Sequence, residues 1–394
     1  MSSRVYLDYA ATAPLLPEVR RALDAFYDAS SNEVGWQANA NSLHSDGRKA
    51  FAALEDARAR IASVLNVRPH ELVFTGCATE SSNAALTGIV LDVLKHKGQV
   101  PHIVTSTIEH DATFKTVQQL EKLGFCQASY VSPNRAGFVE LESIKQAMRS
   151  DTTLVSLIVA HNETGAINDI ARIGQYLSEQ GVLFHIDAVQ ALGKMPFDLG
   201  TLPVDLASFS AHKIGGPKGI GLLAVKTGTN LVPLLSGGGQ EAGLRSGTQN
   251  VAGAFAFAAA CETACSDYSV LEAETQRLRN LRDFLYEQLS SLPRVHMTVP
   301  CDAGSKNYLP NIVNICVEDV ESETLILQLD LNGFSVSGGS ACSTHSLKPS
   351  RTLLELGIPR DLAQGALRIS MGPQTSKEDI DSFIATFEKV LSSL

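Results

Sequence analysis

Short runs of apolar and β-branched residues alternate with polar turns and helix-like stretches between about residues 70 and 225. Continuous apolar runs of this kind are typical of buried parallel strands, and their alternation with helices predicts an α/β sheet. The predicted strands cover residues 71–74, 102–106, 153–160, 182–186, 204–209 and 220–225.

Helical periodicity is clearest in three stretches. Apolar residues at 170, 173, 174 and 177 predict a crossover helix over 170–180, leucines spaced along 267–292 predict a long amphipathic helix, and a last helix runs from about residue 377 to the end. Alternating segments near 312–317 and 334–336 predict strands of a second sheet. We therefore expect a large α/β domain of residues 15–260 and a smaller α+β domain of residues 1–14 and 261–394.

Composition excludes several classes of partner. The 394 residues carry 42 acidic and 32 basic side chains, a formal charge of −10. Because nucleic-acid phosphates need a positive protein face and no basic stretch is present, we expect no direct nucleic-acid binding. The longest apolar runs, 154–160 and 251–260, are far shorter than the roughly 20 residues that span a bilayer, and the first residues lack the apolar core of a signal peptide. We expect no membrane segment.

The seven cysteines are irregularly spaced and include no CxxC pair. An odd number without a metal-ligand spacing predicts neither a disulfide framework nor a zinc site, and we expect a reducing, cytoplasmic location. Cys261 and Cys265 lie four apart in an Ala-rich, helix-like stretch, so we interpret them as buried thiols rather than half of a metal site.

Polar residues follow five of the predicted strands at the point where each strand ends. In a doubly wound sheet these positions share the rim at the carboxyl ends of the strands, where ligands bind. One such residue is commonly a helix cap or a turn, but five clusters on one rim predict a ligand site. The clusters are residues 75–80, 109–110, 161–163, Asp187 and 210–213.

Asp187 and two Gly-containing segments are candidate ligand sites without a decisive sequence pattern. Residues 76–79 place small residues and backbone N–H groups before a helix, as in a phosphate cradle, but match neither GxGxxG nor a Walker sequence. Asp187 ends an apolar run, so its carboxylate needs a partner, either a cationic ring nitrogen or a helix N-terminus. The Gly-rich segment 237–250 is either an anion site or a connecting loop.

Lys213 lies between an apolar strand and the Gly-rich segment 215–219. A lysine at a buried strand end can form a Schiff base when burial and nearby positive charge keep its amine unprotonated. Most lysines are simply solvated, so only its neighbours make Lys213 a candidate nucleophile.

Cys342 lies in segment 337–346, which is rich in Gly and Ser. Small residues on both sides predict an exposed, mobile loop, whereas the other cysteines mostly adjoin apolar residues and are expected to be buried. Cys342 is therefore the best candidate for a reactive thiol, with His345 as a nearby base.

Taken together, these residues resemble the group I cysteine desulfurases, the NifS/IscS-like branch of the class V aminotransferase superfamily. The resemblance extends from residues 5–12 to residues 367–372, nearly the whole chain. Its most specific stretches are residues 185–190, 208–213 with 216–219, 244–248 and 340–343.

The resemblance implies a homodimeric pyridoxal 5′-phosphate (PLP) enzyme of fold type I, with a mixed, mostly parallel sheet. Lys213 would hold PLP as a Schiff base, Asp187 would pair with the pyridinium nitrogen and Gln190 would bond the phenolic oxygen. The other implied cofactor contacts are His110 stacked on the ring, Asn162, and a phosphate site of Ala78, Thr79, Ser210 and His212, with Thr248 reaching in from the partner subunit.

The implied reaction converts L-cysteine to L-alanine. Asn162 and Arg368 would receive the substrate carboxylate, and Lys213, His110 and Cys342 would be the catalytic residues. Cys342 would take the sulfur as a persulfide and pass it to an acceptor such as an iron–sulfur scaffold protein. No metal is expected.

Two other functions stay open. A selenocysteine lyase or another PLP-dependent carbon–sulfur lyase would not store sulfur on Cys342, and a sulfur-trafficking scaffold would not be an enzyme. The chain departs from the usual family pattern at Ala13, Cys77, His161 and Pro373, which leaves substrate entry and the choice of acceptor, including tRNA thiolation pathways, open.

Overall fold

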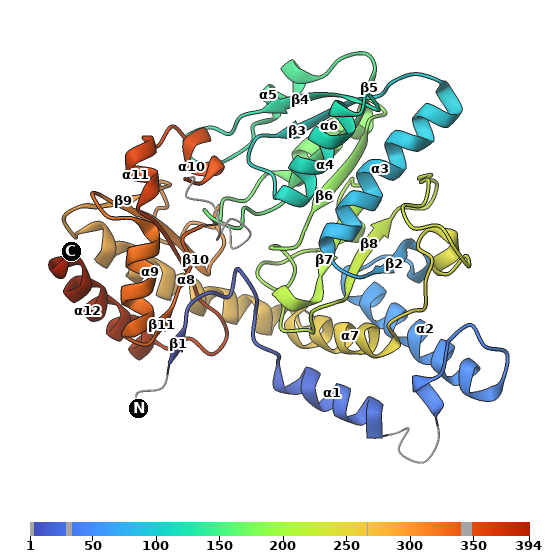
Figure 1. The fold of residues 1–394 in the computed structure, drawn as a ribbon, viewed down its shortest axis with the longest axis horizontal. Helices are drawn as coiled ribbons and strands as arrows, with labels where there is room; N and C mark the ends of the chain where they lie inside the picture. Colours follow the sequence, from blue (N-terminus) through green and yellow to red (C-terminus); the bar gives the residue numbers. More distant parts are fainter. Residues whose placement is uncertain (1–3, 29–33, 266, 340–348) are drawn as a thin grey trace.

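A computed structural model describes residues 4–28, 34–265, 267–339 and 349–394 of the chain. The chain forms two lobes (Figure 1). The larger one is built on a seven-stranded sheet with helices on both faces, and the smaller one contains a three-stranded sheet covered by helices.

The seven-stranded sheet is mixed and mostly parallel, as predicted. Its strand order is β2-β8-β7-β6-β5-β3-β4, and only β8 runs against its neighbours. The strands are β2 (Leu72–Thr75), β3 (His102–Ser106), β4 (Gln127–Val131), β5 (Thr152–Ile158), β6 (Leu183–Asp187), β7 (Leu206–Ser210) and β8 (Gly221–Val225).

All six predicted strands of this region are confirmed, with two differences. Strand β8 is antiparallel to β7, because the short connection between them cannot hold the crossover that parallel strands need. Strand β4 was not predicted. It lies at the edge of the sheet with most of its residues partly exposed, so its sequence lacks the apolar run of a buried strand.

Helices cover both faces of the large sheet because successive strand residues point to opposite sides. Val104 and Leu222 pack in one apolar cluster with helices α2, α6 and α7, whereas their neighbours Ile103 and Leu223 pack in another with α3 and α4. The helices of this lobe are α1 (Pro17–Asp28), α2 (Ser45–Leu65), α3 (Ala78–Lys97), α4 (Asp111–Lys122), α5 (Leu141–Ala147), α6 (Ile170–Glu179) and α7 (Val251–Cys265), with short 3₁₀ turns η1 (Gly35–Gln37), η2 (Pro69–Glu71), η3 (Leu199–Thr201), η4 (Ala211–Lys213) and η5 (Glu241–Gly243).

The smaller lobe combines the C-terminal part of the chain with its N-terminal strand. Strand β1 pairs with β11, and Leu7 is buried in the same apolar cluster as helices α8, α9 and α12. Both predicted helices and both predicted strands of this part are confirmed. The elements are β1 (Val5–Tyr6), α8 (Tyr268–Ser290), β9 (Val295–Met297), β10 (Ile312–Val317), α9 (Ser322–Leu331), β11 (Phe334–Ser335), α10 (Arg351–Glu355), α11 (Arg360–Gln364), β12 (Ala366–Ser370) and α12 (Lys377–Ser393).

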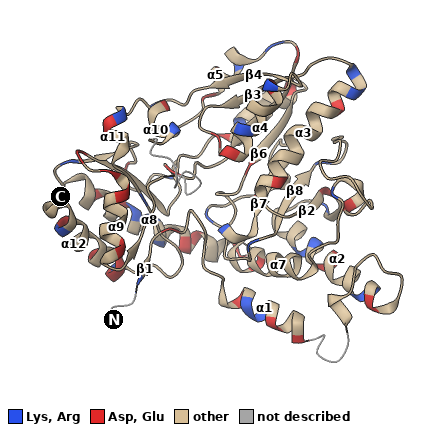
Figure 2. Cartoon of the chain, in the orientation of Figure 1, with Lys and Arg blue, Asp and Glu red and all other residues tan. Residues whose placement is uncertain are grey.

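Charged residues lie mainly on the helices and connecting segments (Figure 2). Strands β5, β7 and β8 contain none, which fits their burial on both faces. Within the described part of the chain, no helix has the length and apolar character needed to cross a membrane.

Candidate active site

One cavity of about 200 Å³ gathers residues from both lobes at the carboxyl ends of the large sheet's parallel strands. Every predicted site residue that the structure describes, except Thr248, lines it. The predicted residues around the cavity are Ala78, Thr79, His110, Asn162, Asp187, Gln190, Ser210, His212, Lys213 and Arg368.

Two predicted residues lie elsewhere. Thr248 is exposed and is not among the residues that line the cavity, although Arg245, nearby in the chain, bonds to Glu80 of helix α3 through its Nε atom at 2.8 Å. Cys342 and His345 lie outside the described residues, so the predicted loop is represented only by its two flanking segments.

Asp187 ends strand β6 and is 4% exposed. Its Oδ1 atom accepts a hydrogen bond of 3.0 Å from the backbone N–H of Val189. Burial raises the pKa of the Asp187 carboxyl, while His110, the Val189 N–H and Lys213 oppose that rise. A buried carboxylate with only one such bond is suited to a cationic partner in the cavity.

Lys213 follows strand β7 in the short turn η4. Its Nζ atom donates to the backbone oxygens of Ala10 at 2.7 Å and Ala11 at 2.8 Å. The N-terminal segment that supplies these carbonyls is fixed by the bond from the Ala13 N–H to the His212 oxygen, 2.9 Å. The chain's first residues therefore help to hold the candidate nucleophile.

Helix α3 presents its N-terminus to the cavity. Its cap residue, Cys77, supplies no side-chain hydrogen bond to the helix, and Cys77, Ala78 and Thr79 all line the cavity. The start of strand β8 packs so closely here that a Cβ atom on Gly221 would lie 2.5 Å from the Cys77 carbonyl carbon. An uncapped helix N-terminus lined by small residues is suited to an anionic group such as a phosphate.

Two histidines line the cavity. His110 caps helix α4, and its Nδ1 atom accepts from the Ala112 N–H at 3.1 Å, which places the proton of a neutral ring on Nε2. His212 lies 3.1 Å from the Thr12 hydroxyl through its Nδ1 atom, and burial lowers its pKa to about 4. His212 is therefore neutral at pH 7.

Glu109, directly before His110, is 2% exposed and accepts a 2.5 Å hydrogen bond from the Ser106 hydroxyl. Burial raises its pKa to about 8, so the side chain is mostly protonated at pH 7. The sequence placed Glu109 in a strand-end cluster but assigned it no role.

Arg368 reaches the cavity from strand β12 of the smaller lobe and has a side chain 1% exposed. It donates to the Asn162 backbone oxygen and to the Asp8 carboxylate, both at 2.9 Å. Its Nε atom is buried and has no hydrogen-bond partner within the described residues. The Nε–H can therefore still take an acceptor, such as a carboxylate bound in the cavity.

Gln190 is held from two sides. Its Nε2 atom donates to the Ala10 oxygen at 2.9 Å, and its Oε1 atom accepts from Lys194, a lysine only 9% exposed. Burial lowers the pKa of Lys194 well below its usual value, and the charges of Lys213 and Arg368 act in the same direction.

Sequence reasoning missed the supporting groups Asp8, Ala10, Ala11 and Lys194. Asp8, Ala10 and Ala11 lie within residues 5–12, where the resemblance to the family begins, but nothing in that stretch assigned them a role. Lys194 is a lone lysine among mostly apolar residues, which carries no pattern of its own.

Cysteines and metal-ligating side chains elsewhere in the described residues form no further candidate site. The six described cysteines are free, and five of them are buried as expected, whereas Cys77 is exposed. Burial raises the pKa of Cys265 to about 12 and that of Cys261 well above its usual value, which agrees with two buried thiols. Within the same residues, no three His, Cys, Asp or Glu side chains are grouped so that they could hold a metal ion.

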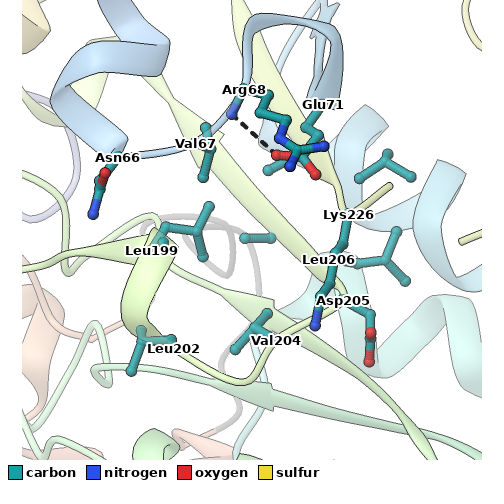
Figure 3. Close-up of a pocket in the computed structure, with 14 residues that line it drawn as sticks. Asn66, Val67, Arg68, Glu71, Leu199, Leu202, Val204, Asp205, Leu206 and Lys226 are labelled. Carbon is teal, nitrogen blue, oxygen red and sulfur yellow. Dashed lines mark hydrogen bonds between the residues drawn. The ribbon is translucent and has the colours of Figure 1, made fainter. Parts of the chain in front are cut away.

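A larger cavity, about 390 Å³, lies at the opposite ends of the strands, where β2 and β7 begin and β8 ends. Figure 3 shows Arg68 beside Glu71 and Lys226 near Asp205, around apolar side chains. The Glu71 carboxylate is occupied by Arg68 N–H at 3.0 Å and Thr227 N–H at 2.9 Å. These contacts bind the local turns together, and no predicted site residue lies there.

The sequence pattern described as aminotransferase class-V matches residues 5–383. A protein of Dictyoglomus turgidum named "Cysteine desulfurase IscS" is 40% identical over 100% of this chain and 96% of its own length, and one of Clostridium botulinum with the same name is 40% identical over 99% and 95%. A solved structure titled "NIFS-LIKE PROTEIN" superposes with a TM-score of 0.88 at 36% identity, covering 99% of this chain and 100% of that one. The chain belongs to the aminotransferase class-V family, within its branch of NifS/IscS-like cysteine desulfurases.

Proposed function

We propose that this chain is a PLP-dependent cysteine desulfurase that takes sulfur from L-cysteine onto Cys342 and releases L-alanine. The observation that carries the proposal is the cavity itself, where a lysine amine, a buried carboxylate, an uncapped helix N-terminus and a buried guanidinium meet. These four groups come from four separate segments of the chain and from both lobes.

The residues present fit PLP group by group. Lys213 supplies an amine for the aldehyde, Asp187 a buried anion for the pyridinium nitrogen, and Gln190 an amide for the phenolic oxygen. The phosphate would lie at the N-terminus of α3, near Ala78 and Thr79, with Ser210 and His212 beside it. His110 would stack on the ring, because it lines the same cavity with its Nδ1 atom already engaged.

When bound, PLP supplies an electron-withdrawing ring that weakens bonds at the α- and β-carbons of an amino acid. The remaining tasks belong to the protein. Arg368 and Asn162 bind and orient the substrate carboxylate, with Arg368 held in place by Asp8. Lys213 holds a proton at Nζ, where the Ala10 and Ala11 oxygens stabilise the ammonium form, and exchanges it with substrate carbon.

The sulfur step uses the thiolate of Cys342. Its Sγ atom attacks the substrate Sγ atom, so that a sulfur–sulfur bond forms while the substrate Cβ–Sγ bond breaks. The electron pair of the broken bond stays with Cβ, which takes up a proton and becomes the methyl group of alanine. The enzyme keeps a persulfide, and no external oxidant or reductant is consumed.

Several further assignments support this activity as parts of the same proposal. We propose a homodimer, in which the exposed Thr248 would contact the partner's PLP phosphate, and an iron–sulfur scaffold protein as sulfur acceptor. We also propose that residues 15–260 and residues 1–14 with 261–394 act as two domains. The proposed location is cytoplasmic, where the free Cys342 thiol stays reduced between turnovers.

The test uses the purified holoenzyme and its Cys342→Ser variant. We expect a yellow protein whose visible spectrum shifts with L-cysteine in both forms, and alanine and sulfide production that the variant loses. A variant that still releases sulfide at the wild-type rate would refute the persulfide step and favour a lyase that stores no sulfur. A protein that remains colourless after PLP is added would refute the assignment of PLP.

A further inference from the structure

The segment that carries Cys342 leaves and re-enters the described structure at two places close together. Gly339 is the last described residue before residues 340–348, and Ser350 caps helix α10 directly after them. A Cβ atom on Gly339 would lie 4.0 Å from the Cβ atom of Ser350, so the two flanking segments are in van der Waals range. The side chain between them is that of Glu163.

Glu163 is bonded to the segment that follows residues 340–348 and lies beside the segment that precedes them. Its Oε2 atom accepts a 2.6 Å hydrogen bond from the Ser350 hydroxyl, and a Cβ atom on Gly339 would lie 3.3 Å from that Oε2. The side chain is buried, with the residue only 5% exposed. A buried carboxylate needs hydrogen-bond partners, and here one partner is Ser350, the residue that caps helix α10 just after the loop.

The neighbouring residues strengthen the same junction. His161 Nε2 lies 3.1 Å from the Thr352 hydroxyl and 3.0 Å from the Ile108 oxygen, which ties helix α10 to the large lobe. On the other side, the backbone of Ser337 pairs with that of Arg368 through two hydrogen bonds. Strand β12 therefore holds the N-terminal end of the loop, and His161 and Glu163 hold its C-terminal end. The two residues flank Asn162, a residue of the candidate active site.

We propose that Glu163 is a positioning residue for sulfur transfer, because its carboxylate anchors Ser350, at the C-terminal end of the Cys342 segment, next to Asn162. This inference rests on the proposed function. A thiol on a loop whose ends are fixed beside the site has a higher effective concentration there than one whose ends drift. Glu163 thus acts through Ser350, without contact with the reacting atoms.

The test separates sulfur transfer from the events at the cofactor. In holoenzyme mixed with one equivalent of L-cysteine, two rates are measured: the change of the visible spectrum, and the appearance of persulfide on Cys342 by mass spectrometry. We expect Glu163→Ala and Ser350→Ala to slow persulfide formation about tenfold or more, as for loss of a buried hydrogen bond, and to leave the spectral change within about twofold.

Two comparisons make the result specific. Glu163→Gln retains an oxygen that accepts from Ser350, so we expect it to restore most of the rate, and the double Glu163→Ala, Ser350→Ala variant to be no slower than the slower single variant. The matched control is Ser132→Ala. It removes a 3.0 Å serine-to-glutamate bond that also joins the large lobe to helix α10, at Glu355, but away from the loop ends. It should change neither rate.

Three results would overturn the inference. Persulfide formation within twofold of the wild-type rate in both alanine variants would show that the junction does not position the thiol. Equal slowing of both measured rates would assign Glu163 a general structural role. Absence of any Cys342 persulfide in the wild-type enzyme would refute the proposed function, and this inference with it, and is distinguished because it appears without a substitution.

Discussion

The large sheet has one cavity at the amino ends of its parallel strands and a smaller one at their carboxyl ends, and the smaller one is the proposed active site. At the amino-terminal edge of strand β7, about 390 Å³ is lined by apolar side chains and by charged groups such as Arg68, Glu71 and Lys226. At its carboxyl-terminal edge, about 200 Å³ is lined by Asp187 and Lys213. Volume alone would have selected the other cavity, which contains no predicted site residue.

The two edges use their charged residues differently. The Glu71 carboxylate accepts hydrogen bonds from the backbone N–H groups of Arg68 and Thr227, while the Arg68 and Lys226 side chains are exposed. At the other edge, Asp187 and Arg368 are buried and come from different lobes. Burying polar groups without full pairing costs free energy, so a set of them around one cavity indicates binding or catalysis.

The largest contrast is expected between two lysines, one at each edge. Lys213→Ala removes the amine that would bind the cofactor, and we expect the rate of alanine formation from L-cysteine to fall at least about a thousandfold, with loss of the visible band. Lys226→Ala removes an exposed side chain at the larger cavity, and both readouts should stay within about twofold of the wild type.

The activities of these two lysine variants can contradict the assignment of the reaction to the smaller cavity in two ways. Full activity in Lys213→Ala would remove the smaller cavity from the reaction. A large loss in Lys226→Ala, with the thermal unfolding temperature unchanged, would bring the larger cavity into it.

The next effect concerns Glu109, whose pKa is raised by burial to about 8. Between pH 4.5 and 8 the unfolded chain has lost this proton while the folded chain still holds it, so stability falls as pH rises, by about 1.4 kcal/mol per pH unit. Glu109→Gln has no proton to lose. We expect the free energy of unfolding of the variant, relative to that of the wild type, to rise by a few kcal/mol from pH 5 to pH 8, measured by urea unfolding.

Glu71 provides the control, because it too is a glutamate in the large lobe but its pKa is lowered. Burial opposes this shift, and the hydrogen bonds from Thr227 and Arg68 outweigh it. Glu71→Gln should therefore show no such gain with rising pH. A stability difference for Glu109→Gln that stays constant from pH 5 to pH 8 would mean that Glu109 is ionised throughout.

The sequence predicted the rim of the active site because backbone topology alone places it. Apolar runs identified β6 and β7 as buried strands, and parallel strands bring the residues that follow them, Asp187 and Lys213, to one edge. No side-chain geometry was needed for that step. The same argument could not reach β4, which lies at the edge of the sheet with little apolar pattern.

Contacts between distant segments could not be predicted in this way. Lys213 is held by Ala10 and Ala11, about 200 positions earlier in the chain, and Arg368 by Asp8. Alanines contribute here through backbone oxygens, which no residue pattern encodes. Glu163 likewise has a role only because Ser350 folds back to meet it. Such partners depend on how the two lobes pack, and a single sequence without that packing does not specify them.

The smallest effect is expected at the larger cavity, where Glu71 joins the turn before β2 to the segment after β8. Its Oε2 atom accepts from the Arg68 N–H at 3.0 Å, and its Oε1 atom accepts from the Thr227 N–H at 2.9 Å and hydroxyl at 2.7 Å. We expect Glu71→Ala to lower the free energy of unfolding by about 1–2 kcal/mol, as for loss of a helix cap, without changing the rate of alanine formation at 25 °C.

Arg68→Ala separates the backbone from the side chain at the same place. Since Glu71 uses only the Arg68 N–H, which alanine retains, this variant should cost less than about 0.5 kcal/mol. A loss in Arg68→Ala as large as that in Glu71→Ala would mean that the guanidinium itself holds the turn. A fall in activity in either variant, at a temperature where both remain folded, would contradict the proposed separation of stability and catalysis. The amino ends of the strands would then contribute to the reaction as well as to stability.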